Sequence, residues 1–272
     1  MNFAQLPAIK EWVASWRLLA QSKAYLVMSA VLDALFFMAY GFLTAPILDK
    51  LTTHIIIIGS LAAEQLRVPA GRMRPAVIDL IFQPPVSQYT YQFLGLLVLL
   101  GLVVFVLFCL VQGTNWRFAS WLTHRKLGWR QHLLQFARVN LFWFVLYAVW
   151  YCIDAVLDLR RIAIEKATGE PSAATGIAWT AVLVLLVYFA VISYPELSIR
   201  KGFLLGIRKA TTMVPAAIIL IAHFLAGNLV VRLIGKVNPA AMFIIGVVVL
   251  LLLIAWVRLY ITLVVRRAAH GI

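Results

Sequence analysis

Three polar side chains interrupt long apolar stretches of this sequence, and they are its first candidates for chemistry. They are Asp33, Asn140 and His223. A carboxylate and an imidazole at membrane depth can relay protons or bind a cation or a polar substrate, and such groups are costly to bury without a role. The same side chains can instead hydrogen-bond across helices and hold them together. The sequence therefore leaves two hypotheses open, an intramembrane polar site or a set of packing contacts.

The other residues that could do chemistry are not spaced as a catalytic or metal-binding motif requires. Arg232 and Arg258 lie near the ends of apolar stretches, where we expect their long stems to snorkel to the interface. Cys109 and Cys152 sit inside apolar runs and are typical of buried structural thiols. The sequence contains no HExxH, GxSxG, Walker or GxGxxG motif. We therefore expect no enzyme, no metal site and no cofactor.

The apolar stretches themselves predict the fold class. The 272 residues are 64% hydrophobic and 12% charged, whereas a soluble domain is about half apolar and about a quarter charged. The apolar residues form unbroken runs instead of alternating, which indicates membrane-spanning helices and not barrel strands. A span needs about 20 apolar residues. The segments that qualify are residues 23–48, 91–112, 138–157, 176–194, 212–234 and 238–264.

We therefore predict an all-α, polytopic membrane helix bundle, with residues 1–272 as a single membrane domain. The six spans group as three hairpins. The last two are joined only by residues 235–239, so they must form a tight antiparallel pair. Each odd-numbered span follows a basic, partly apolar stretch. Within residues 1–22, apolar side chains recur at helical spacing, which predicts a helix lying in the interface.

Lysine and arginine predict the orientation of the spans. One set of flanks holds 14 of these residues and the opposite set holds 8, and basic residues are retained on the cytoplasmic side. Both termini are therefore predicted to be cytoplasmic. The net charge of +14 suits anionic lipid headgroups and not nucleic acid, because the cations flank spans. The residues expected to contact headgroups are Arg17, Lys23, Arg125, Lys126, Arg130, Arg208 and Lys209.

Residues 49–90 form the least ordinary region, a long loop that is predicted to be non-cytoplasmic. Loops of this length are usually functional or carry structure of their own. Its stretch from Ile55 to Ala63 is apolar but too short to span. It could be re-entrant, interfacial, partner-binding, or an extra helix that caps the bundle.

Two functions follow from these features. The first is a non-catalytic subunit or scaffold of a membrane assembly in a prokaryotic plasma membrane, with protein partners or a second copy of the chain. The second is a small transporter or channel component with a polar path near Asp33, Asn140 and His223. A dry bundle in which these residues pack separately would favour the first function. A wet cavity lined by two or more of them would favour the second.

Overall fold

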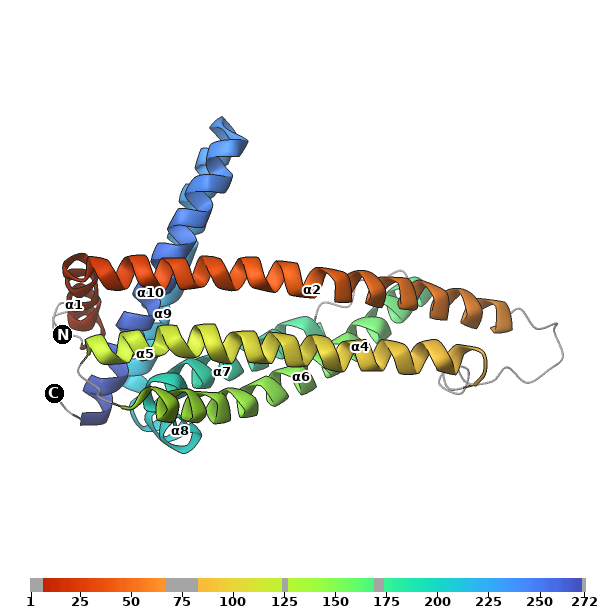
Figure 1. Ribbon diagram of the computed structural model, residues 1–272, viewed down its shortest axis with the longest axis horizontal. Helices are drawn as coiled ribbons and strands as arrows, with labels where there is room; N and C mark the ends of the chain where they lie inside the picture. The colour runs from red at the N-terminus through yellow and green to blue at the C-terminus, as the bar shows by residue number, and fades with distance from the viewer. Residues whose placement is uncertain (1–6, 67–82, 124–126, 169–173, 271–272) are drawn as a thin grey trace. The chain divides into compact units, whose positions relative to one another are not determined.

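The computed structural model describes residues 7–66, 83–123, 127–168 and 174–270. Every regular element in these ranges is a helix (Figure 1). The helices are α1 (Pro7–Gln21), α2 (Lys23–Leu66), α4 (Val86–Leu107), the π-helical turn η2 (Phe108–Gln112), α5 (Gly113–Leu122), α6 (Trp129–Thr168), α7 (Ala174–Glu196), α8 (Ile199–Arg208), α9 (Ala210–Val237) and α10 (Pro239–His270).

Six helical segments of the described chain are long and apolar enough to cross a membrane. They cover Lys23–Leu61, Val86–Leu122, Trp129–Asp158, Trp179–Glu196, Ala210–Val237 and Pro239–Ala269. Each of them overlaps one of the six spans predicted from the sequence. The prediction of an all-α, multi-pass membrane protein is confirmed.

Helix α2 differs from the expectation at the end of the first span. It does not stop at residue 48 but runs on to Leu66, so Ile55–Ala63 is a continuation of the same helix and not a separate re-entrant or surface element. Its 44 residues correspond to about 66 Å of helix, roughly twice the thickness of a hydrocarbon core. The rest of the expected loop falls partly on residues 67–82, which lie outside the described residues.

The second span also continues past its expected end. A π turn, η2, joins α4 directly to α5, and such turns widen a helix by one residue and often occur at functional sites. The basic stretch before the third span is therefore divided between α5 and α6 and is not an independent interfacial helix. Arg125 and Lys126 lie outside the described residues.

Helices α9 and α10 form the predicted tight antiparallel hairpin (Figure 1). Asn238 alone separates them, and its Oδ1 accepts hydrogen bonds from the backbone N–H groups of Ala240 and Ala241 at 2.9 and 3.1 Å. Pro239 occupies the first position of α10, where its missing N–H costs nothing. The cap and the proline explain why the chain turns so sharply here.

The chain divides into two compact units, residues 1–34 with 109–272 and residues 35–108. In the second unit, Phe36 packs edge-on against Phe108 at 6.2 Å between ring centroids. Further along α2, His54 Nε2 lies 2.9 Å from Gln92 Oε1 of α4. The first contact joins α2 to the first residue of η2, and the second joins α2 to α4.

In the first unit, α1 packs against α9 and α10, and α8 packs closely against α7. A glycine pair permits the second contact, because a Cβ on Gly202 would come within 2.2 Å of Ser193 Oγ and one on Gly206 within 2.8 Å of Phe189. Small residues four apart let helix backbones approach in this way. The buried residues Ala8, Ser15 and Leu19 form the face of α1 that docks on its neighbours.

Candidate functional site

A buried ion pair joins α2 to α10 in the first unit. Arg258 Nη1 donates to Asp33 Oδ2 at 2.8 Å, and Nη2 donates to Asp33 Oδ1 at 2.6 Å. Only 1% of Asp33 and 3% of Arg258 is exposed. Two parallel N–H···O bonds between a guanidinium and a carboxylate form the strongest and most directional type of ion pair. The expectation that Arg258 snorkels to the interface is thus corrected, because its head is engaged inside the bundle.

Neutral side chains add further hydrogen bonds to this pair. Asp33 Oδ1 also accepts from Gln112 Nε2 at 3.1 Å and from Asn115 Nδ2 at 3.0 Å. Arg258 in turn donates to Gln112 Oε1 at 2.5 Å and to Ser29 Oγ at 2.9 Å. A buried ion pair is tolerated when further hydrogen bonds satisfy its remaining donors and acceptors. Here Ser29, Gln112 and Asn115 supply such bonds from three helical segments.

Helix geometry explains how these five side chains meet. Ser29 and Asp33 are four residues apart and therefore share a face of α2. Gln112 and Asn115 are three residues apart, at the point where η2 passes into α5. Arg258 faces both pairs from α10, and Thr262, one turn further on, bonds back to the Arg258 carbonyl at 2.7 Å. The last residue of the π turn, Gln112, thus bonds directly to both members of the ion pair.

His223 belongs to a different cluster, which is aromatic. Its Nε2 accepts a hydrogen bond from Trp12 Nε1–H at 3.0 Å, and its Nδ1 lies 2.8 Å from the Ile219 carbonyl. Because Nε2 accepts, Nδ1 carries the proton that is donated to that carbonyl, which is the arrangement of a neutral imidazole. The ring stacks on Trp256 at 4.5 Å, and Trp16 stacks on the same indole at 5.2 Å. His223 therefore helps to dock α1.

Further polar contacts support the docking of α1. Trp256 Nε1–H donates to Ser15 Oγ at 2.9 Å, and the Tyr260 hydroxyl donates to the Ala8 carbonyl at 3.2 Å. Glu11 forms an ion pair with Arg267 at 2.7 Å. The first helix, expected to lie in the interface, thus has one face buried against α9 and α10.

Asn140 forms a third cluster, between η2, α6 and α7. Its Nδ2 donates to Cys109 Sγ at 3.3 Å, and its Oδ1 accepts from the Tyr194 hydroxyl at 3.1 Å. Asn140 is 4% exposed and Cys109 is 9% exposed. Cys109 is buried, as predicted, whereas the same prediction for Cys152 is wrong, because its side chain is exposed.

The structure thus distributes the three sequence-predicted residues over three separate clusters, each with its own bonding partners. Asp33 does not bond to His223 or Asn140, and none of the three lines either of the two cavities described below. The sequence reasoning placed Arg258 at the interface, wrongly, and missed Gln112, Asn115 and Ser29.

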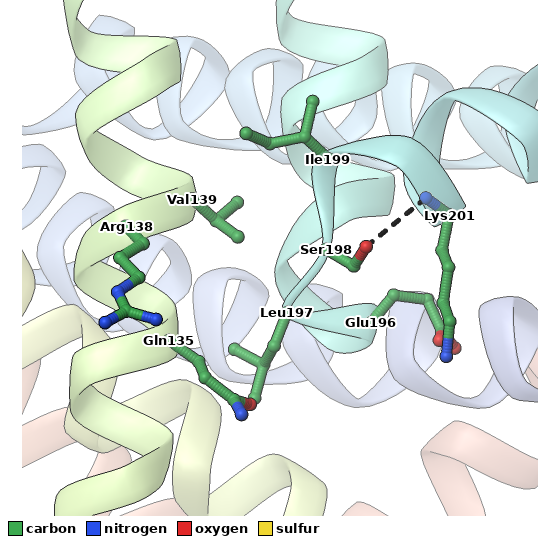
Figure 2. Close-up of a pocket in the computed structure, with 8 residues that line it drawn as sticks. All are labelled: Gln135, Arg138, Val139, Glu196, Leu197, Ser198, Ile199 and Lys201. Carbon is green, nitrogen blue, oxygen red and sulfur yellow. Dashed lines mark hydrogen bonds between the residues drawn. The ribbon is translucent and has the colours of Figure 1, made fainter.

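A polar cavity of about 460 Å³ opens where α6 meets the turn from α7 to α8 (Figure 2). Gln135, Arg138, Glu196 and Lys201 supply its polar side chains. Ser198 caps α8 by accepting the Lys201 backbone N–H at 3.4 Å, as Figure 2 shows. An arginine, a lysine and an amide can bind a phosphate or a carboxylate. No histidine lines the cavity to activate the Ser198 hydroxyl as a nucleophile.

The expected headgroup contacts are exposed wherever the structure describes them. These residues are Arg17, Lys23, Arg130, Arg208 and Lys209. Arg232, on the opposite end of α9, is exposed too. Their exposure leaves them available to charged groups outside the helices.

Fold and site together define a multi-pass α-helical membrane protein with a buried ion pair that bonds to side chains of neighbouring helices. Its polar groups bond to one another across helices, in arrangements that can fix helix neighbours. No protein-family model, curated protein or solved structure matches the chain.

Proposed function

We propose that the protein is a non-catalytic subunit or scaffold of a larger membrane assembly in a prokaryotic plasma membrane, with both termini in the cytoplasm. The orientation follows from the basic residues that gather at one set of span ends. The scaffold role is supported by an apolar surface on α2 and by the way in which the buried polar residues are used.

The observation that carries the proposal is the apolar surface on α2 beyond Asp49 and Lys50. Ile55 and Ile56 are 57% and 65% exposed. Ile55 follows Asp49 by six residues, which is about 9 Å along a helix. Two adjacent charged residues favour the headgroup level, so we infer that these isoleucines lie outside the hydrocarbon. Neighbouring apolar side chains that are exposed outside the hydrocarbon offer a surface for contact with another protein, which supports the proposal.

The polar clusters support the same reading. Asp33, Asn140 and His223 each bond to side chains of neighbouring helices. Their hydrogen-bonding groups are used to hold helices together. This use counts against the alternative, a transporter or channel component whose polar path would need these three residues to line one water-filled route.

The proposal is tested by photo-crosslinking in native membranes. A benzophenone side chain is introduced at Ile56, and the same side chain at Phe42 serves as control. Phe42 lies on the same helix, inside the predicted span, and is 82% exposed. We expect a discrete protein adduct from position 56 and none from position 42, where the side chain meets lipid.

Purification in a mild detergent followed by native mass spectrometry gives the composition of the assembly. A partner of fixed stoichiometry, identical to the protein in the adduct, supports the proposal. A lone protomer without any adduct at position 56 contradicts it. Reporter fusions at both termini test the orientation independently. A non-cytoplasmic signal at either terminus would contradict the proposed orientation.

A further inference from the structure

An apolar groove runs between α7, α9 and α10 in the first unit. Its volume is about 420 Å³. Aliphatic side chains line it almost throughout, and its lining residues on α9 run from Met213 to Phe224. Tyr188 lines it as well, but its hydroxyl is directed to the Gly206 carbonyl at 2.9 Å. The groove therefore offers van der Waals contact along its length and little hydrogen bonding.

The length of the groove matches one leaflet of a bilayer. Met213 and Phe224, eleven residues apart on α9, mark about 16 Å of helix. Half of a hydrocarbon core is about 15 Å thick. An extended acyl chain in one leaflet spans this same length, so the groove can hold a single acyl chain along α9.

Cationic side chains stand at one end of the groove. The backbone N–H of Met213 donates to the Lys209 carbonyl at 2.9 Å, which puts Lys209 one helical turn beyond the groove lining. Arg208 precedes it as the last residue of α8. Both side chains are exposed. Basic residues directly beside an apolar span attract anionic headgroups.

We propose that this groove binds one acyl chain of an anionic phospholipid, whose phosphate lies against Arg208 and Lys209. The site depends on the membrane-spanning fold and is independent of the scaffold function proposed above. The groove determines where the acyl chain binds, and the two basic side chains select a lipid with an anionic headgroup.

The acyl-chain site is tested with Ala217→Trp, which puts an indole into the groove from α9. Ala222→Trp is the matched control, because Ala222 is exposed on the same helix and does not line the groove. Phosphatidylglycerol is titrated against each purified variant, and the bound fraction is read by native mass spectrometry. We expect binding about tenfold weaker for Ala217→Trp, since displaced apolar contact area reduces affinity, and unchanged binding for Ala222→Trp.

The headgroup is tested with phosphatidylcholine of the same chain length. The wild-type protein should prefer phosphatidylglycerol by about tenfold or more, because two basic residues meet its charge. The double substitution Arg208→Ala and Lys209→Ala should abolish that preference. Arg232→Ala with Lys236→Ala removes the same charge from the other end of α9 and should leave the preference intact.

Three results would overturn the proposal. A folded Ala217→Trp variant that binds phosphatidylglycerol like the wild type excludes the groove. Equal wild-type affinities for the two lipids exclude the headgroup contact. A wild-type dimer that Ala217→Trp converts to a monomer shows that a second copy occupies the groove. If Ala217→Trp does not fold, Val187→Phe on the α7 wall is measured and judged by the same criteria.

Discussion

The ion pair between Asp33 and Arg258 makes the sharpest prediction about stability. Asp33→Asn keeps the shape of the side chain but removes its charge, and leaves a guanidinium that is 3% exposed without a counter-charge. Arg258→Gln leaves the carboxylate with only the amide donors of Gln112 and Asn115. Removing one partner of a buried pair costs about 3–5 kcal/mol.

The expected loss lies at the lower end of that range. In Asp33→Asn, the guanidinium keeps Gln112 Oε1 and Ser29 Oγ as acceptors. We therefore expect each single substitution to lower the free energy of unfolding by about 3 kcal/mol. The double substitution removes both charges and should cost only about 1–2 kcal/mol, because two neutral amides can bond to each other. The coupling free energy is then about 4–5 kcal/mol.

Reversible unfolding in mixed micelles, titrated with dodecyl sulfate and followed by tryptophan fluorescence, measures these quantities. Asp49→Asn and Arg232→Gln are the controls, since both residues are exposed, and each should cost under about 0.5 kcal/mol. Single substitutions that cost under about 1 kcal/mol and add without coupling would refute the buried pair.

Two other contacts make predictions that the same unfolding assay can check. Gly202→Ala forces a Cβ to within 2.8 Å of the Ser193 Cα and should cost about 1–3 kcal/mol through overpacking, while Gly41→Ala, which meets nothing within 4 Å, should be neutral or stabilising. Equal effects of the two glycine substitutions would contradict the close approach of α7 and α8. Ser15→Ala removes the acceptor of the buried Trp256 indole N–H and should cost about 1–3 kcal/mol; unchanged stability would show that α1 does not dock through this contact.

The fold was largely predictable because hydrocarbon imposes a strong length rule on apolar segments. Each predicted span overlaps a helix of the described chain. The ends were less predictable, since a backbone that has become helical in the membrane does not have to stop at its surface. After Asp49 and Lys50, the residues up to Leu66 include no proline, and the helix simply continues.

The candidate site was half predicted. Asp33 stands out in the sequence, but Arg258 was assigned to the interface because it lies near the end of its span. A comparison of how deep the two residues lie in the membrane would have predicted that they form a pair. Asp33 lies ten residues from Lys23, about 15 Å along a helix, and Arg258 lies nine residues from Arg267, about 13 Å. An unpaired charge at this depth in the membrane is costly, so opposite charges at equal depth indicate an ion pair.

His223 could not have been interpreted from its own surroundings. Its partner Trp12 is 211 residues away in the chain, and nothing in the periodicity of residues 1–22 distinguishes a helix that lies on lipid from one that docks on protein. The contact became visible only when the arrangement of α1, α9 and α10 was known. Long-range polar partners of this kind depend on tertiary packing, which a local pattern does not carry.

The three polar clusters of the first unit each connect a different set of helices, which favours a structural role for them. The ion pair of Asp33 and Arg258 connects α2, η2, α5 and α10. His223 connects α9 to α1, and Asn140 connects α6 to η2 and α7. Apolar side chains do not distinguish a lipid tail from a neighbouring helix, so they specify neighbours poorly. Each polar cluster instead bonds to particular neighbouring helices and so specifies which helices pack together. A water-filled path would need its polar residues along one route, not in three separate clusters.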